Sequence, residues 1–281
     1  MSVAATGAGG LFVSDIDGTL VTPDKLLTPA ALEAAAELKA VGVPFTVVSS
    51  RPPRGMARIV EALGITLPYA AYNGGAVVGA DGAVLEAHHL PVAAARAALA
   101  LIADRGVAPW AFADGAWLAT DPDGPHVAHE RMTVGFEATF VAASGFAAVI
   151  DRIDKIVAAS DDHGLLDRIE RELRAVLGAR ADVERSQAYY VDVTHPLANK
   201  GEAVKALARL TGAVLEATVV IGDMPNDIAM FRVAGFAIAM GQAPEPVKAA
   251  AAAVTDSDTA DGFAKAVRAF VLPRLAPAKV G

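Results

Sequence analysis

The composition is that of a globular, acidic protein. The chain has 281 residues, of which 54% are apolar and 20% charged, so it can bury a sizeable core, and this composition argues against general disorder. The net charge of −8 disfavours nucleic-acid binding, which usually leaves a basic footprint. The absence of cysteine excludes disulfides, a thiolate zinc site and a cysteine nucleophile.

The sequence shows no sign of a membrane span or an export signal. No apolar run approaches the ~20 residues that cross a bilayer. The opening MSVAATGAGG lacks the positive charge and the apolar stretch of a signal peptide, and it is expected to be a loose tail. We therefore expect a cytoplasmic protein with no membrane or nucleic-acid partner, and the sequence leaves the oligomeric state open.

Strands and helices alternate in the first part of the chain. Thr28-Pro29 begins one helix, with Thr as the N-cap and Pro as the first helical residue, and Gly42 follows its end. A second helix is expected to reach about Leu63. The expected strands are short and apolar: Leu11–Ser14, Pro44–Val48 and Tyr69–Tyr72. This alternation predicts βαβ units and a parallel sheet.

The middle of the chain mixes hairpins with helices. Asp81-Gly82 and Asp114-Gly115 each lie between alternating residues, which indicates two hairpins. Helices are expected near residues 91–105 and 163–177, with Gly178 ending the second. The mixture predicts an α+β domain that is separate from the parallel sheet.

The alternation of the first part then returns. Helices are expected at Asn199–Leu210, Pro225–Val233 and Asp261–Phe270, and strands at Thr218–Ile221 and Phe236–Ala239. Both ends of the chain are therefore expected to build one α/β core, a doubly wound, Rossmann-like parallel sheet made of residues 1–80 and 191–281. Residues 81–190 are expected to form an inserted α+β domain.

Polar residues follow the expected strands, and ligands of an open parallel sheet bind at that edge. They are Asp15, Asp17, Ser49, Asn73, Asp223 and Asp227, joined by Asn199-Lys200 at the start of a helix. Carboxylates gathered at one sheet edge repel one another. A hard cation such as Mg²⁺ relieves the repulsion and keeps coordination positions for an anionic ligand.

Four motifs, in order, resemble those of the haloacid dehalogenase (HAD) superfamily of phosphatases. They are Asp15-Ile16-Asp17-Gly18-Thr19 after LFVS, Ser49 at the end of PFTVV, Asn199-Lys200-Gly201, and Gly222-Asp223-Met224-Pro225-Asn226-Asp227 after TVVI. The place of the inserted domain, between the second and third motifs, is similar to that of the Cof-like subgroup with a type IIB cap. The resemblance extends from Leu11 to about Phe270 and implies a HAD-like core with an α+β cap. The chain departs from the subgroup at Ser50, where Gly often precedes Arg.

The chemistry of phosphate ester hydrolysis suggests roles for the first motif. The reaction needs neutralisation of the dianion, an in-line nucleophile and protonation of the leaving oxygen. Asp15 is expected to be the nucleophile, because an aspartyl-phosphate divides one hard step into two. Asp17 is expected to act as general acid toward the leaving group and then as general base for water.

The remaining site residues are assigned to metal and phosphate binding. We expect Asp15, the backbone carbonyl of Asp17, and Asp223 to hold Mg²⁺, with Asp227 supporting these ligands from behind or binding the ion through water. The Asp17 carbonyl is included because the resemblance implies it. Ser49, Ser50, Lys200 and Asn226 are expected to bind the phosphoryl oxygens. Arg51 is a candidate for substrate binding or for a surface ion pair, and Asn73 for substrate binding or for a capping role.

These residues predict a Mg²⁺-dependent phosphatase of small phosphorylated metabolites, such as a sugar phosphate or a similar phosphomonoester. The cap is expected to close over the site and to choose the substrate. A phosphosugar mutase with the same phospho-aspartate chemistry and a non-catalytic sensor of phosphate ligands are the alternatives. The intact Asp17 argues against a sensor, since a pure binder has no need of an acid–base group.

Overall fold

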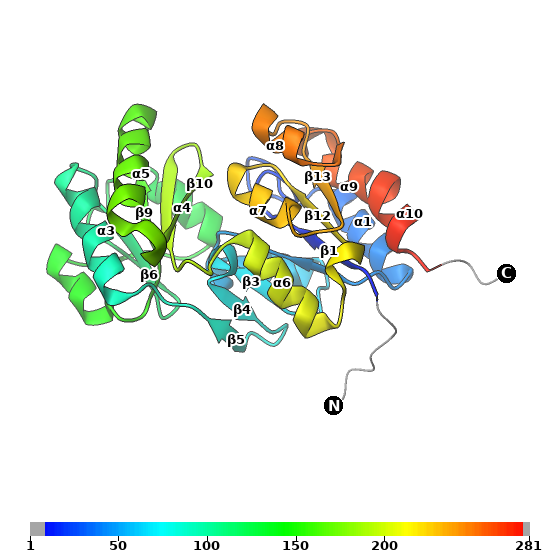
Figure 1. Cartoon of the computed structure of the whole chain (residues 1–281), viewed down its shortest axis with the longest axis horizontal. Coiled ribbons are helices and arrows are strands. Elements are labelled where there is room, and N and C mark those ends of the chain that lie inside the picture. Colours follow the sequence, from blue (N-terminus) through cyan, green and yellow to red (C-terminus); the bar gives the residue numbers. More distant parts are fainter. Residues whose placement is uncertain (1–8, 278–281) are drawn as a thin grey trace.

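A five-stranded parallel sheet forms the centre of one lobe of the computed structural model, which describes residues 9–277 (Figure 1). The strand order is β14-β13-β12-β1-β2. The strands are β1 (Leu11–Ser14), β2 (Phe45–Val47), β12 (Thr218–Gly222), β13 (Phe236–Ala239) and β14 (Ala253–Val254). Because β1 lies between β2 and β12, the two ends of the chain build one sheet, as the sequence predicts.

Helices cover both faces of this sheet. They are α1 (Pro29–Ala40), α2 (Pro53–Ala62), α6 (Lys200–Thr211), α7 (Ile228–Phe231), α8 (Glu245–Ala250), α9 (Gly262–Ala266) and α10 (Leu272–Leu275). Successive β1 residues point to opposite faces: Phe12 packs in the cluster that includes α1 and α9, and Leu11 in the cluster that includes α6 and α7. The doubly wound α/β fold is therefore confirmed.

A small antiparallel sheet extends the edge of β2. It contains β3 (Tyr69–Ala71), β4 (Ala76–Val78) and β5 (Val84–Ala87), with the predicted Asp81-Gly82 turn between the last two. One parallel bridge, Val48 to Ala70, joins it to the large sheet. The expected strand through Tyr72 ends one residue earlier, because Tyr72 and Asn73 take positive φ angles of 52° and 57° and turn the chain.

A six-stranded sheet forms the second lobe, with the order β10-β11-β9-β6-β7-β8. Its strands are β6 (Trp110–Ala113), β7 (Ala116–Ala119), β8 (Thr139–Phe140), β9 (Ile153–Ala159), β10 (Asp182–Gln187) and β11 (Tyr190–Thr194). The helices of this lobe are α3 (Val92–Asp104), α4 (Val127–Val134) and α5 (His163–Leu177). Figure 1 shows α3 and α5 on the outside of the lobe.

The two faces of the six-stranded sheet differ in character. Ile156 and Val191 belong to the apolar cluster that also contains the buried side chains of α3 and α5. Their strand neighbours Lys155 and Asp192 point to the opposite face, because side chains alternate along a strand. This second face, called the inner face below, is turned toward the parallel-sheet lobe.

Two predicted helices take a different form. The segment Pro225–Val233 begins as a 3₁₀ turn, Pro225–Asp227, before the four-residue α7. The Asp227 side chain accepts hydrogen bonds from the backbone N–H groups of Asp223 and Met224, both at 2.8 Å, and so holds the turn. The last helix continues past Phe270 to Leu275 through a π-helical turn that precedes Pro273, a residue without an N–H donor.

The described part of the chain contains no helix with both the length and the apolar character that a bilayer crossing requires. The expected N-terminal tail falls mainly on residues 1–8, which lie outside the described residues.

Candidate active site

The carboxyl ends of β1 and β12 bring three acidic side chains together. Asp15 follows β1 directly, and Asp223 and Asp227 lie after β12. One carboxylate oxygen from each residue lies within 4.8 Å of the other two. All three side chains are buried, where charge is costly unless it is compensated. The donor set of hard carboxylate oxygens fits a divalent metal ion.

Lys200 places one positive charge inside this acidic group. It is the first residue of α6, and its Nζ lies 2.7 Å from Asp15 and 2.6 Å from Asp227. Burial lowers the pKa of Lys200, but the two carboxylates outweigh it and raise this pKa above its usual range. The lysine therefore stays charged. It still leaves the three carboxylates with a net negative charge when all are ionised.

The protonation of the acidic group reflects this imbalance. Burial raises the pKa of Asp15 to about 7; Lys200 opposes the rise and Asp227 adds to it. Burial, together with Asp15 and Asp227, also raises the pKa of Asp223 well above its usual value. Carboxylates that ionise with difficulty when alone are stabilised as anions by a bound divalent cation.

Two glycines allow the loops of the site to approach closely. Gly18 has a φ of +74°, and a Cβ atom there would collide with the Asp223 carboxylate. A Cβ atom at Gly222 would collide with the Asp227 side chain. A side chain at either position would therefore push the acidic residues apart.

The Asp17 carboxylate has different partners from the other three. Arg51 binds both of its oxygens, through Nε and Nη2 at 2.7 Å each, and Lys25 Nζ lies 2.8 Å from Oδ1. Burial would raise the pKa of Asp17, but Arg51 and Lys25 outweigh it and hold this pKa well below its usual range. Asp17 is therefore an ionised hydrogen-bond acceptor in this arrangement.

Arg51 also connects the two lobes. Its Nη1 donates to the backbone carbonyl of Thr133, in α4, at 2.8 Å. The side chain is only 5% exposed, so Arg51 makes an ion pair, as one sequence interpretation expected, but a buried one rather than a surface one. Asp17 and the second lobe are thus linked through a single guanidinium.

The other predicted phosphate and substrate residues lie in the same region. Ser49 is buried after β2, and its Oγ accepts a hydrogen bond from the Arg51 backbone N–H at 3.2 Å. The Asn226 side-chain amide donates to Asn73 Oδ1 at 3.2 Å. The Ser50 carbonyl accepts a hydrogen bond from Lys155 Nζ of β9 at 3.0 Å. These contacts join the loops that follow β3 and β12, and they connect the loop after β2 to β9 of the second lobe.

Residues of the second lobe that sequence reasoning did not select also border the site. A small cavity beside Asp17 is lined by His129 and Glu130 from α4, Lys155 from β9, Tyr190 at the start of β11, and Tyr189 just before it. Its volume is about 20 Å³, room for about one water molecule. The lobes are therefore closed on each other. The sequence signal was weak: the otherwise largely apolar strand β9 carries two adjacent charges, Asp154 and Lys155.

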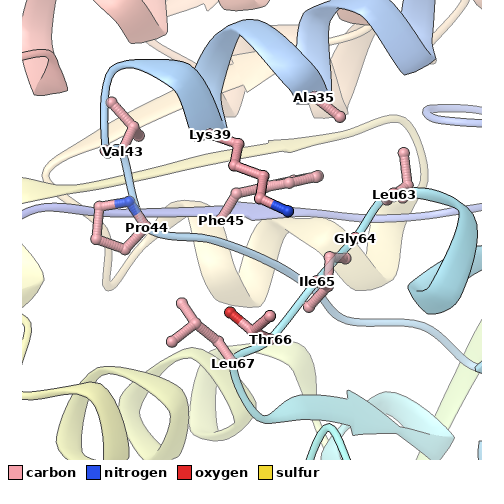
Figure 2. Close-up of a pocket in the computed structure, with 11 residues that line it drawn as sticks. Ala35, Lys39, Val43, Pro44, Phe45, Leu63, Gly64, Ile65, Thr66 and Leu67 are labelled. Carbon is pink, nitrogen blue, oxygen red and sulfur yellow. The ribbon is translucent and has the colours of Figure 1, made fainter. Parts of the chain in front are cut away.

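A more open cavity lies away from this group. It has a volume of about 250 Å³ and is formed by the segments that precede β2 and β3, with Phe45, Leu63 and Leu67 among its walls (Figure 2). Lys39 is its only charged lining residue, and none of the acidic residues above reaches it. Its place at the amino end of β2 is opposite to the edge where the polar motifs gather, so it is not part of the candidate site.

Comparisons with known proteins agree with this geometry. A family model described as haloacid dehalogenase-like hydrolase matches residues 12–267. The chain is 27% identical to pyridoxal phosphate phosphatase YbhA of Escherichia coli strain K12, over 92% of this chain and 97% of that protein. It is 30% identical to phosphoglycolate phosphatase of Natronomonas pharaonis, over 90% of this chain and 94% of that protein.

Solved structures show the same fold. The HAD subclass IIB sugar phosphatase BT4131 superposes with a TM-score of 0.81 at 23% identity, over 94% of this chain and 99% of that chain. The chain therefore belongs to the haloacid dehalogenase-like hydrolase family. It is an enzyme, a hydrolase whose curated relatives include several named phosphatases.

Proposed function

We propose that this hydrolase is a Mg²⁺-dependent phosphatase that removes phosphate from small phosphorylated metabolites, such as sugar phosphates, through an aspartyl-phosphate on Asp15. The observation that carries the proposal is the buried group of Asp15, Asp223 and Asp227, with Lys200 paired to Asp15 and Asp227. The acid–base candidate Asp17 lies two positions after Asp15 in the chain. The names of the relatives support the same reaction class.

The acidic group and the backbone carbonyl of Asp17 would hold Mg²⁺. The bound ion would supply positive charge to the phosphoryl oxygens and to the Asp15 carboxylate, which lets a dianion and a carboxylate meet. Lys200 adds a second positive charge beside Asp15. Ser49, Ser50 and Asn226 are proposed to bind the remaining phosphoryl oxygens.

In the proposed reaction Asp15 attacks phosphorus and the bond to the leaving oxygen breaks. Asp17 gives its proton to that oxygen, then takes a proton from the water that hydrolyses the aspartyl-phosphate. In the closed arrangement Asp17 is held ionised by Arg51 and Lys25. Its acid role therefore requires those ion pairs to loosen when a substrate occupies the site.

The second lobe is proposed to be the cap, formed mainly by residues 81–190. Two strands cross these proposed boundaries. β11, in the six-stranded sheet, continues past residue 190 to Thr194, and β5, which begins after residue 81, pairs with β4 beside the parallel sheet. A cavity of about 20 Å³ does not hold a sugar phosphate. The cap must therefore move away to admit substrate and return to exclude water.

The reaction class can be tested with a panel of phosphorylated metabolites, with released phosphate as the readout. We expect phosphate release from several small monoesters in the presence of Mg²⁺ and none with a chelator. The Asp15→Asn variant is the matched control, since it keeps the shape of the side chain and replaces one carboxylate oxygen with an NH₂ group. Conversion of a sugar phosphate to an isomer without phosphate release would identify a mutase instead.

Metal binding should depend on pH in a direction set by Asp15. Its folded-state pKa of about 7 lies above its ordinary value, so ionising Asp15 destabilises the metal-free fold as pH rises from about 4 to about 7. A bound cation needs the ionised form. We therefore expect Mg²⁺ to raise the melting temperature more at about pH 8 than at about pH 5.5, measured by thermal denaturation. An equal increase at both pH values would show that Asp15 does not gain its charge on binding.

A further inference from the structure

The inner face of the six-stranded sheet carries buried polar atoms that lack a hydrogen-bond partner. Within residues 9–277, these include both carboxylate oxygens of Asp192, Oε2 of Glu184 and Oγ of Ser186. Asp192 is 1% exposed and Ser186 is 4% exposed, so bulk water does not satisfy them. Buried polar atoms without partners are rare in folded proteins and call for an explanation.

The strand register places these atoms in one patch. Glu184 of β10 lies directly opposite Asp192 of β11, and a bulge between Glu184 and Gln187 contains Ser186. β10 packs against the turn Pro225–Asp227, and Figure 1 shows it on the side of its lobe turned toward α7. Asn226 in that turn also has an unpartnered side-chain oxygen, Oδ1. The patch therefore faces the loop that carries the candidate metal ligands.

The patch contains more acceptors than donors. Lys155 is the cation beside Asp192, at 3.6 Å, but its Nζ already donates to the Ser50 carbonyl and lies over the Phe112 ring at 4.9 Å. Burial and Asp182 raise the pKa of Glu184 to about 8, and burial also raises the pKa of Asp192. Lys200, which also acts on Glu184 and Asp192, is already paired with Asp15 and Asp227, and Arg185 of β10 pairs with Asp167 of α5. A further negative charge in this patch would therefore meet only cations that already have carboxylate or carbonyl partners. A group that brings hydrogen-bond donors would satisfy the open oxygens.

An apolar wall stands beside this patch on the same face. The inner-face residues of β6 and β7 are Trp110, Phe112, Trp117 and Ala119, which are all buried. The rings of Trp110 and Trp117 lie edge to face with their centroids 5.2 Å apart. An alcohol with several hydroxyls presents both surfaces that such a site needs, C–H groups for the rings and O–H groups for the carboxylates.

We propose that Asp192 and Glu184 are specificity-determining residues that select leaving groups rich in hydroxyl donors and reject leaving groups that carry a carboxylate. The proposal rests on the proposed phosphatase function, because the leaving group is the part of the substrate that meets the cap. It also separates this chain from its relative named phosphoglycolate phosphatase, whose named substrate carries a carboxylate.

Two matched pairs of phosphate esters test the selection. Glycerol 3-phosphate and 3-phosphoglycerate differ only in a hydroxymethyl group against a carboxylate, and sorbitol 6-phosphate and 6-phosphogluconate differ in the same way on a longer chain. We expect kcat/KM for the alcohol to exceed that for the acid by about tenfold or more in the pair that is turned over faster. In Asp192→Asn this ratio should fall by about tenfold, mainly through KM, because the isosteric amide removes an acidic group and offers N–H donors to a carboxylate.

The control is Asp104→Asn, which removes a carboxylate from the exposed end of α3 and should leave the ratio unchanged. Glu184→Gln is the second variant, expected to lower the ratio in the same direction. Equal ratios in wild type and both inner-face variants, or a wild-type preference for the acids, would overturn the proposal. Thermal denaturation of each variant shows whether it is folded.

A binding measurement separates this proposal from the proposed function. Trp110 and Trp117 are the only tryptophans of the chain, and both lie on the inner face. Quenching of their fluorescence by sorbitol 6-phosphate and by 6-phosphogluconate, with chelator present to prevent turnover, gives the relative affinities. If no ester releases phosphate under any condition, the phosphatase assignment fails. Tighter binding of the alcohol, with that preference reduced in Asp192→Asn, would still support the selection, whereas equal binding would refute it.

Discussion

Replacing Asp15 by Asn should abolish turnover while the protein stays folded. Asn has nearly the same shape, but its amide cannot form an aspartyl-phosphate, so kcat should fall by at least about 10⁴-fold. The substitution removes one of three crowded acidic groups, and burial already raises the pKa of Asp15 to about 7. At neutral pH and without metal, the melting temperature of the variant should therefore lie within a few degrees of the wild-type value, or above it.

The matched control is Asp24→Asn, an exposed carboxylate nine residues further along the chain. It should keep wild-type activity. Acid quenching during turnover should leave phosphate covalently attached to the wild type and to Asp24→Asn, and none on Asp15→Asn. Near-wild-type activity in Asp15→Asn, with the substitution verified by intact mass, would remove Asp15 from the role of nucleophile.

The core of the fold and the placement of the acidic group were predictable from the sequence. Short apolar runs that end in polar residues mark parallel strands, and ligands of such sheets lie at their carboxyl ends. That rule alone brings Asp15 and Asp223 to one edge, because β1 and β12 are neighbours. The position of Lys200 as the first residue of a helix was also predictable, because Asn199 is a typical N-cap, and in the structure its side chain accepts a hydrogen bond from the Glu202 N–H.

The contribution of the second lobe was not predictable in the same way. Local patterns gave its hairpins and helices, but not which sheet face would meet the catalytic loops, since that depends on packing between lobes. The informative signal was weak: Lys155 and Asp192 each place a charge in a strand that is otherwise mostly apolar. A charge in a buried strand indicates a polar neighbour across an interface, but it does not identify that neighbour.

Arg51 shows the same limit in one residue. The sequence left two interpretations of Arg51 open, substrate binding or a surface ion pair, and the structure gives it a buried ion pair with Asp17 and a hydrogen bond to the Thr133 carbonyl. Closure of the lobes therefore bears on the charge state of Asp17, because the guanidinium that holds the carboxylate ionised is itself held by α4. No spacing rule within a sequence encodes a contact that forms only when two lobes meet.

Replacing Lys200 by Met should lower both stability and activity, and the stability loss should depend on pH. The variant keeps the length of the side chain but leaves Asp15 and Asp227 buried without their common cation. Removing one partner of a buried ion pair costs about 3–5 kcal/mol of unfolding free energy. The loss should be largest above the Asp15 pKa of about 7 and smaller below it, because protonation of Asp15 then removes one of the two charges.

Lys205→Met provides the control on the same helix. Lys205 is exposed and pairs with Glu202 at 2.7 Å, so its loss should cost at most about 1 kcal/mol at any pH. Denaturant unfolding of both variants at about pH 5.5 and about pH 8, with and without Mg²⁺, separates the two sites. Added Mg²⁺ should restore part of the Lys200→Met loss, because the cation binds carboxylates that the lysine no longer neutralises. If Lys200→Met is no less stable than Lys205→Met, the three carboxylates do not depend on Lys200, and the electrostatic basis assigned to the site is wrong.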